Sequence, residues 1–337
     1  MQVPATKLIA PGHRALPGSE RKRGKRVVVA QELGYCWGVR RALEIVEAAA
    51  ESTEPIAPIG DVIHNPQVVE RLRQRGVEGA GSVAEAAARG FRRVAITAHG
   101  MGPHLAGEAA SAGVELIDTT CPLVTKVHRE AAIHFKRGRE ILLIGHSHHP
   151  EVVGTLGQLP AGAVTLIETA EDAKTFTPKD PNNLAFVTQT TLSIDDTAEI
   201  VALLKERFPN INGPHKEDIC YATTNRQLAV KKVAPVVDAL IVVGAPNSSN
   251  SQRLREVAER EGCPVSVLAQ RASDLDWSRF EGITSLGITA GASAPEVIVE
   301  EIMGAFAERY TLHVETVSAA EENEFFPLPR SLRPDAA

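Results

Sequence analysis

Short apolar runs and longer amphipathic segments alternate along most of the chain. Runs rich in Val, Ile and Leu occupy residues 27–30, 56–59, 93–97, 114–117, 140–144, 184–187, 239–243 and 283–288. A polar corner and then a segment rich in Ala, Glu and Arg with helical spacing recur after these runs. This order is typical of α/β proteins, in which helices cover a parallel sheet. The sequence therefore predicts an α/β fold with mainly parallel sheets.

The helix after the second run has a well-defined start. Asn65 precedes Pro66, and asparagine is a favoured cap while proline suits the first helical position. We expect a helix over residues 67–74 that is closed by Gly76.

Polar residues gather where each predicted strand ends and a helix begins. Parallel sheets bind ligands at this edge, and the free N–H groups of helix starts favour anions. Three of the corners carry a cysteine, each at the start of about a third of the chain. We therefore expect three small α/β modules around a shared centre, with a preceding extension and a C-terminal tail packed on the modules. The expected boundaries are 1–25 for the extension, 26–120, 121–219 and 220–310 for the modules, and 311–337 for the tail.

Length and composition are those of an ordinary globular protein. The 337 residues are 43% hydrophobic and 23% charged, which is compatible with two or three small domains with buried cores. A net charge of −6 argues against a surface that binds nucleic acid, because phosphate neutralisation needs clustered Lys and Arg. A small anionic ligand remains compatible with this charge, since a few aimed donors suffice to hold it.

The sequence also indicates a location. No apolar run of about 18 residues occurs, so we expect no membrane span. The basic run 21–26 lacks the apolar stretch of a signal peptide, and we interpret it as part of a mobile, solvated extension. The four cysteines form no CxxC pair, which favours reduced thiols and a cytoplasmic protein.

Cys36, Cys121 and Cys220 share a setting, because each lies on a corner rich in Gly, Thr or Asn. A single cysteine is more often a small buried apolar residue. For the three together we favour the hypothesis that their thiolates converge on one iron-sulfur cluster, whose complete ligand set is usually four. One iron would then be left for substrate. Cys263 lies in a plain helix-to-strand turn, and we leave it out of the set.

Histidines and small polar residues are candidates for holding an anion. A loop histidine is usually an ordinary surface residue, and a Ser/Asn cluster is usually a turn or cap. However, imidazole donates to a phosphate oxygen in either protonation state, and hydroxyl and amide donors can surround one. The candidates at strand ends and helix starts are His64, His99, His149, Ser248, Ser249, Asn250 and Ser293.

Glu151 and Thr190 are candidates for proton transfer. As a first-turn residue after Pro150, Glu151 would simply favour the helix dipole. Near a dry metal centre, the same carboxyl group would have a raised pKa and could pass a proton to a leaving oxygen. The Thr190 hydroxyl could relay that proton. Spacing alone assigns neither role.

Several common site types are missing from the sequence. There is no G-x-x-x-x-G-K-[ST] loop, no H-E-x-x-H helix and no G-x-S-x-G elbow. The dispersed cysteines also lack the close pairs of structural zinc.

These corners resemble those of a known enzyme family. The motifs GYCWGV, AHG, DTTCPLVTKVH, GHSHHPEVVGT, QTTLS, ICYATTNRQ, NSSNS and TAGASAPE occur in this order. From about residue 27 to 330, the chain closely resembles the 4-hydroxy-3-methylbut-2-enyl diphosphate reductases, the last enzymes of the methylerythritol phosphate route to isoprenoids. The resemblance implies three α/β modules with pseudo-threefold symmetry around a [4Fe-4S] cluster. Its ligands would be Cys36, Cys121 and Cys220, with the fourth iron open to substrate.

The resemblance also implies residue roles and partners. His64, His99, His149, Thr190, Ser248, Ser249, Asn250 and Ser293 would bind the allylic diphosphate substrate, and Glu151, Thr190 and His149 would be catalytic. The implied reaction removes the allylic hydroxyl with two electrons and two protons, giving isopentenyl and dimethylallyl diphosphates. The implied electron donor is a carrier such as ferredoxin or flavodoxin with its reductase.

Two alternatives and two departures accompany this interpretation. An iron-sulfur hydro-lyase would use the open iron without net electron transfer, and a diphosphate-sensing iron-sulfur protein would bind without turnover.

Trp37 and Arg40 beside Cys36 depart from the usual family pattern, and so does the basic extension. Neither departure falls on a predicted ligand.

Overall fold

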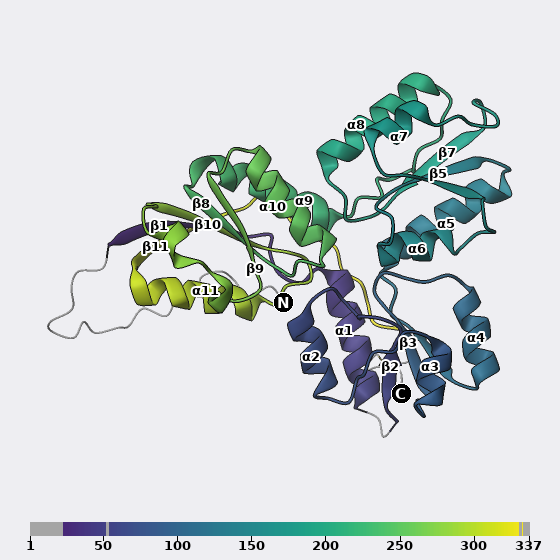
Figure 1. Cartoon of the computed structure of the whole chain (residues 1–337), viewed down its shortest axis with the longest axis horizontal. Coiled ribbons are helices and arrows are strands. Elements are labelled where there is room, and N and C mark those ends of the chain that lie inside the picture. The colour runs from purple at the N-terminus through teal and green to yellow at the C-terminus, as the bar shows by residue number, and fades with distance from the viewer. Residues whose placement is uncertain (1–22, 52–53, 330–331, 333–337) are drawn as a thin grey trace. The chain divides into compact units, whose positions relative to one another are not determined.

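The computed structural model describes residues 23–51, 54–329 and 332. Within them the chain forms two compact units. Unit 1 comprises the residues up to Tyr35 together with Tyr221–Asn323, and unit 2 comprises Cys36–Cys220 with the residues from Glu324 onward. The chain therefore passes from one unit to the other immediately before Cys36, immediately after Cys220 and after Asn323 (Figure 1).

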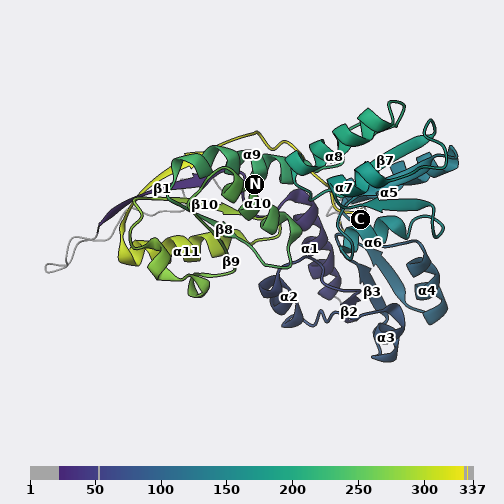
Figure 2. The same cartoon turned by 45° about the horizontal axis from the view of Figure 1, so that its top comes forward.

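Unit 1 is built on one five-stranded parallel sheet. Its strand order is β11 (Thr311–Val317), β1 (Gly24–Ala30), β10 (Ser285–Ala290), β8 (Ala239–Val243) and β9 (Val265–Ala269). One face packs on α11 (Glu296–Arg309) with the short η3 (Ala272–Asp274) and η4 (Trp277–Phe280). The other packs on α9 (Tyr221–Val233), η2 (Ala234–Val236) and α10 (Ser249–Arg260) (Figures 1 and 2). Side chains alternate between the faces: Val27 and Val29 join the first core, and Val28 the second.

The first sheet of unit 2 has the order β2 (Ile56–Pro58), β3 (Arg93–Ile96) and β4 (Glu115–Asp118). Two helices, α3 (Val83–Ala88) and α4 (His104–Ala112), share an apolar core with one of its faces. On the other face α1 (Trp37–Ala50) packs against β2, and α2 (Pro66–Arg73) lies beside α1 (Figure 1).

The second sheet of unit 2 has the order β6 (Val164–Ile167), β5 (Glu140–Ile144) and β7 (Leu184–Thr188). Its two faces pack on different helix pairs. One pair is α7 (Ala170–Thr175) with α8 (Ile194–Arg207), and the other is α5 (Pro122–Lys136) with α6 (Pro150–Leu156). Every strand pair in the described sheets is parallel, which confirms the predicted α/β fold.

The predicted helix start at Asn65 is confirmed. The Asn65 Oδ1 accepts hydrogen bonds from the backbone N–H groups of Gln67 at 3.1 Å and Val68 at 3.2 Å, and Pro66 is the first helical residue. The cap thereby satisfies two of the N–H groups that a helix start leaves without partners.

Both ends of the chain differ from the expected module boundaries. Strand β1 lies between β10 and β11 in unit 1, whereas β2 belongs to a sheet of unit 2. The first part of the expected tail forms β11, because its residues pair with β1 from Gly24↔Thr311 to Ala30↔Val317. The three-module division remains a prediction. Most of the expected extension, residues 1–22, lies outside the described residues.

The interpretation of the basic run as solvated is wrong for Lys25, whose residue is 2% exposed. Its ammonium group donates to the carbonyl oxygens of Phe280 at 3.1 Å and Ile283 at 2.5 Å, and it lies 4.2 Å from the centre of the Tyr310 ring. These partners come from distant parts of the chain, so the local pattern of basic residues could not reveal them.

The described helices are short. The longest, α5, has 15 residues, and among the described residues no helix combines the length and apolarity needed to cross a bilayer.

Candidate functional site

Three helix starts carry the candidate cluster ligands, and all three cysteines belong to unit 2. Cys36 caps α1, and its Sγ accepts the N–H of Val39 at 3.4 Å. Cys121 precedes Pro122 at the start of α5, while Cys220 comes directly before α9. A Cβ added to Gly38 would lie 2.6 Å from the Sγ of Cys121 and 3.8 Å from the Sγ of Cys36. Glycine at this position therefore leaves open a space that both sulfur atoms border.

The pKa of the Cys121 thiol indicates that Cys220 also lies near it. Burial raises the pKa of its thiol, and the negative charges of Cys36 and Cys220 raise it further. Coulomb interactions weaken with distance, so all three thiols lie within electrostatic reach. A bound metal centre would supply positive charge that favours the thiolate form of such a cysteine.

A single metal ion and an iron-sulfur cluster place different demands on the positions of their ligands. Among the described residues, no three His, Cys, Asp or Glu side chains are close enough to hold one metal ion. A single zinc ion needs all its ligands within about 2.3 Å of one point, whereas an iron-sulfur cluster spreads its cysteine ligands over different irons. Thiols are the ligand type of iron-sulfur centres, so the chemistry of Cys36, Cys121 and Cys220 suits such a group, and their role as its ligands remains a prediction.

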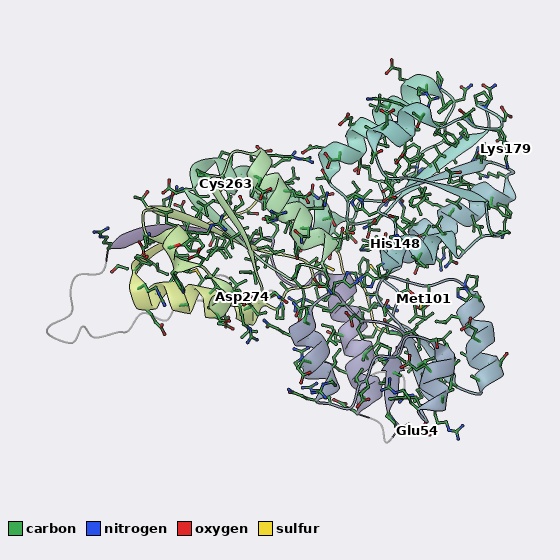
Figure 3. The ribbon with its side chains drawn as sticks, in the orientation of Figure 1. Glu54, Met101, His148, Lys179, Cys263 and Asp274 are labelled. Carbon is green, nitrogen blue, oxygen red and sulfur yellow. The ribbon has the colours of Figure 1, made fainter. Side chains whose placement is uncertain are left out.

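Cys263 belongs to a different unit from the other three cysteines. It belongs to unit 1, in the turn after α10, and packs in the core beneath β8 (Figure 3). Its Sγ lies 3.5 Å from the carbonyl oxygen of Val265.

Residues beside the cysteines fix the helix starts. The N–H of Cys121 donates to the carbonyl oxygen of Ala98 at 3.0 Å. The guanidinium group of Arg41 donates to the carbonyl oxygens of Thr120 and Pro327, both at 3.2 Å. Trp37, which departs from the usual family pattern, packs edge-on against Phe325 with ring centres 5.0 Å apart. The segment after Glu324 therefore packs on the beginning of α1.

The three candidate histidines meet in unit 2. The ring centres of His64 and His99 are 4.1 Å apart in a stacked arrangement, and His149 lies edge-on at 5.6 Å from His64 and 5.8 Å from His99. Gly100, next to His99, has a φ of 76°, and a Cβ there would lie 2.7 Å from the Cε1 of His128, so glycine lets this loop lie close to α5. The structure therefore brings the three predicted histidines together, and their role in binding remains a prediction.

Burial keeps these imidazoles neutral at pH 7. It lowers the pKa of His149 to about 4, with the charges of His64 and His146 acting in the same direction. Burial also lowers the pKa of His64, and that of His99 well below its usual value. The Nδ1 of His149 accepts the N–H of Glu151 at 3.2 Å, so in the neutral ring the proton is on Nε2. His149 is therefore a neutral hydrogen-bond donor.

Glu151 and Thr190 form a buried pair. The carboxylate of Glu151 accepts the Thr190 N–H at 2.7 Å and the Thr190 hydroxyl at 2.8 Å. Burial raises the pKa of Glu151 to about 7, and the negative charge of Asp218 adds to the rise, although both Thr190 hydrogen bonds oppose it. The N–H of Cys220 donates to the Thr190 carbonyl oxygen at 3.1 Å, so the pair is tied directly to a candidate cluster ligand. A carboxyl group with this pKa can exchange protons near neutral pH.

The serine and asparagine candidates meet in unit 1. The hydroxyl oxygens of Ser248 and Ser293 lie 3.3 Å apart. Asn250 accepts the N–H of Ala292 at 2.9 Å, which joins the start of α10 to the loop after β10. Ser249 is half-buried at the first position of α10. The structure thus gathers the predicted residues into two groups, one in each unit.

Sequence reasoning missed two supports of these groups. Ser251 is fully buried, and its hydroxyl donates to Ser248 at 3.1 Å. Asp218 is buried behind Glu151 and forms an ion pair with Lys126 at 2.8 Å. Ser251 lies inside the NSSNS motif, and Asp218 directly precedes the motif ICYATTNRQ. The contact of Asp218 with Lys126 joins residues 92 positions apart, so no local pattern could reveal it.

Comparisons with known proteins agree over most of the chain. The family model for LytB protein matches residues 27–307. The "4-hydroxy-3-methylbut-2-enyl diphosphate reductase 1" of Bradyrhizobium diazoefficiens is 74% identical over 93% of this chain and 97% of its own length. The reductase 2 of the same name from Rhodopseudomonas palustris is 71% identical over 93% of this chain and 98% of its own.

Solved structures give the same result for the fold. The E-1-hydroxy-2-methyl-but-2-enyl-4-diphosphate reductase of Plasmodium falciparum has a TM-score of 0.84 and 32% sequence identity, covering 93% of this chain and 97% of that one. A structure of (E)-4-hydroxy-3-methyl-but-2-enyl diphosphate reductase, described as the terminal enzyme of the non-mevalonate pathway, has a TM-score of 0.60 at 32% identity. It covers 84% of this chain and 99% of its own.

Proposed function

The chain belongs to the family of LytB proteins, and from this premise we propose that it reduces (E)-4-hydroxy-3-methylbut-2-enyl diphosphate to isopentenyl and dimethylallyl diphosphates with the help of one [4Fe-4S] cluster. Family membership makes the chain an oxidoreductase of isoprenoid biosynthesis. The single observation that supports the cluster most directly is the approach of the Cys36 and Cys121 sulfur atoms at Gly38, with Cys220 close enough to act on the pKa of the Cys121 thiol.

We assign the cluster to these three thiolates. Such a cluster supplies electrons for the reduction and, with only three cysteine ligands, an iron that is open to the substrate hydroxyl. Thiolates are the usual protein ligands of such clusters, which favours this assignment. Gly38 provides the room, since any larger residue would fill the space between the sulfur atoms.

We assign the binding of the diphosphate to the predicted neutral donors. His64, His99 and His149 offer neutral imidazoles, and Ser248, Ser249, Asn250 and Ser293 offer hydroxyl and amide groups beside a helix start. Neutral donors hold an anion by aimed hydrogen bonds, which fixes its orientation as well as its position. The net charge of −6 is therefore no obstacle to binding a diphosphate.

The proposed reaction breaks the allylic C–O bond. Two electrons and two protons enter: one proton goes to the leaving hydroxyl oxygen, which departs as water, and the other goes to a carbon of the allyl group. Glu151 is the proposed proton source, and the Thr190 hydroxyl, 2.8 Å from its carboxylate, positions the substrate oxygen and relays the proton. A pKa of about 7 lets Glu151 carry a proton at neutral pH and release it. His149, whose Nδ1 accepts the backbone N–H of Glu151, caps the helix start that carries this carboxylate.

The electrons require an external carrier, and we propose a small protein such as ferredoxin or flavodoxin with its reductase. A hydro-lyase or a diphosphate sensor would need no such supply. Turnover that depends on added reductant therefore separates the reductase from both alternatives.

The test is anaerobic purification of the full chain, followed by iron and sulfide counting and a turnover assay with dithionite. We expect about four irons and four sulfides per wild-type chain. Cys121→Ser is expected to abolish cluster binding. Cys263→Ser is the matched control, because its thiol packs in the core of unit 1, and it is expected to retain the cluster.

Equal cluster loss in both variants would contradict the ligand assignment. A wild-type chain that binds the cluster but turns over no substrate with reductant would favour the sensor.

A further inference from the structure

Lys126 occupies an unusual position for a lysine near the protein surface. It lies on α5, the helix that begins after Cys121. Its ammonium group is 2.8 Å from the Oδ1 of Asp218 and 3.3 Å from the carbonyl oxygen of Glu217, and it also donates to the carbonyl oxygen of Lys216. Glu130, one helical turn further on, is 3.5 Å away. The ammonium group thus donates hydrogen bonds to three consecutive residues, 216–218, of the segment that leads to Cys220.

Asp218 extends this contact into the core. Its side chain is fully buried in the ion pair, whereas that of Lys126 is 25% exposed. The second carboxylate oxygen, Oδ2, accepts the N–H of Thr188 at 2.8 Å, at the end of β7. Two residues beyond Thr188 lies Thr190, whose carbonyl oxygen accepts the N–H of Cys220 at 3.1 Å. One carboxylate therefore joins the Cys220 segment to the strand end that carries Thr190.

The contacts of Lys126 and Asp218 join segments that are distant in the sequence. The helix after Cys121, the segment before Cys220 and the end of β7 are joined through a single charge pair, and all belong to unit 2. Removing one partner of a buried ion pair is costly, because the other charge stays buried without compensation. Without the ammonium group, Asp218 would regain solvation only if residues 216–220 moved outward.

We propose that Lys126 is a positioning residue that fixes the Cys220 segment against α5 and so sets the spacing of the Cys121 and Cys220 thiolates for the cluster. The inference rests on the proposed function for the identity of the cluster. Its mechanical part, that Lys126 holds residues 216–220, does not depend on any bound group. Lys126 touches neither substrate nor cluster ligand, and it acts through Asp218.

The experiment compares three variants of the full chain with the wild type. Lys126→Met removes the charge at similar length, and Lys126→Arg keeps a charge that can still reach Asp218. Lys136→Met is the matched control, since Lys136 is an exposed residue at the end of the same helix. Each is measured by hydrogen–deuterium exchange of amides 216–220 in the metal-free chain, and by iron content and the electron paramagnetic resonance spectrum of the reduced, reconstituted chain.

We expect Lys126→Met to speed amide exchange in 216–220 by about tenfold, the size expected for losing a charge-assisted hydrogen bond to a buried carboxylate. It should also lower iron retention under a chelator and alter the spectrum. Lys126→Arg should restore most of both properties, while Lys136→Met should match the wild type. If Lys126→Met fails to fold, Asp218→Asn replaces it, because an amide oxygen can still accept the Thr188 N–H while the ion pair is lost.

Exchange and spectra identical in Lys126→Met and Lys136→Met would overturn the proposal. So would a general rise in exchange across unit 2 with an unchanged cluster spectrum, because that result indicates a role in overall stability alone. A wild-type chain that binds no cluster would instead refute the proposed function, and the exchange of residues 216–220 would still decide whether Lys126 holds them.

Discussion

Single residues acquire their chemistry from burial at this site. The carboxyl group of Glu151 is 2% exposed and accepts two hydrogen bonds from Thr190, yet burial still raises its pKa to about 7. An exposed glutamate in the same helix position would stay ionised at neutral pH and could not deliver a proton. The local sequence places Glu151 in the first turn of α6, and burial in the surrounding core raises its pKa so that it can hold a proton near neutral pH.

The first residue-scale prediction concerns turnover. In Glu151→Gln, the amide oxygen can still accept a hydrogen bond from Thr190, so we expect substrate affinity close to that of the wild type. The proton source is lost, so kcat should fall by about 100-fold or more, as is usual when a general acid is removed. Steady-state kinetics with dithionite, together with equilibrium binding of substrate, measure both quantities. Near-normal turnover would show that the proton arrives by another route.

The second residue-scale prediction concerns stability against pH. The pKa of Glu151 is higher in the folded chain, about 7, than the usual value of 4.5. Its contribution to stability is therefore fully present below about pH 4.5 and is lost as the pH rises through about 7. Glu151→Gln should reduce the stability difference between pH 5 and pH 8 by about 3 kcal/mol, the equivalent of this pKa shift. Urea unfolding of the metal-free chain measures it.

Glu300→Gln, at an exposed position of α11, is the control for this pH experiment and should leave the pH profile as it is. Parallel profiles for Glu151→Gln and the wild type would contradict the raised pKa.

At the scale of elements, both units use the same close packing between a strand end and the helix that follows. Gly145 follows β5, and its N–H donates to Ile167 at the end of β6; Gly244 follows β8, and its N–H donates to Ala269 at the end of β9. A Cβ on Gly145 would lie 2.6 Å from the Cγ2 of Val152, and one on Gly244 would lie 2.6 Å from the Cβ of Ser251. The glycines thus let α6 and α10 approach the strand ends where the candidate residues are.

The element-scale prediction tests this packing in unit 1. Gly244→Ala should destabilise the chain by about 1–3 kcal/mol through overpacking against Ser251. It should also displace the start of α10 with Ser248 and Asn250, so the affinity for inorganic pyrophosphate should fall. Gly304→Ala in α11 is the matched control, because its Cβ would meet nothing within 4 Å, and it should be neutral or slightly stabilising. Equal stability and affinity in both variants would exclude a close approach at Gly244.

The sequence predicted an element well where neighbouring residues determine it, and poorly where residues distant in the sequence determine it. The start of α2 needs only Asn65 and Pro66, and the pattern placed it correctly. The apolar run at 27–30 was recognised as a strand, but its neighbours β10 and β11 lie more than 250 residues away in the sequence, and no local pattern specifies them. The same limit hid Lys25, Lys126 and Ser251, whose partners are brought close only by folding.

At the scale of the whole molecule, unit 1 is formed by two separate stretches of the chain, and this limits how unit 1 can fold. Its sheet needs β1 as an inner strand, with Val27 paired to Leu286 on one side and to Val314 on the other. The buried side chains of β1 contribute to the cores on both faces of the sheet. A fragment of residues 221–323 would therefore expose two unpaired strand edges and an incomplete core, and strand edges of this kind favour association. Residues 36–220, in contrast, contain two complete sheets.

We accordingly expect the 221–323 fragment to lack a cooperative thermal transition and to aggregate. Fusing residues 23–35 to its C-terminus through a flexible linker of about 12 residues, long enough for a parallel crossover, should restore cooperative unfolding. The same fusion carrying Val28→Asp is the control, since it places a charge in the core between α9 and the sheet and should remain unfolded. Circular dichroism and size-exclusion chromatography distinguish the three. Cooperative, monomeric folding of 221–323 alone would show that β1 is dispensable, and the folding of unit 1 would then not depend on the strand that precedes Cys36.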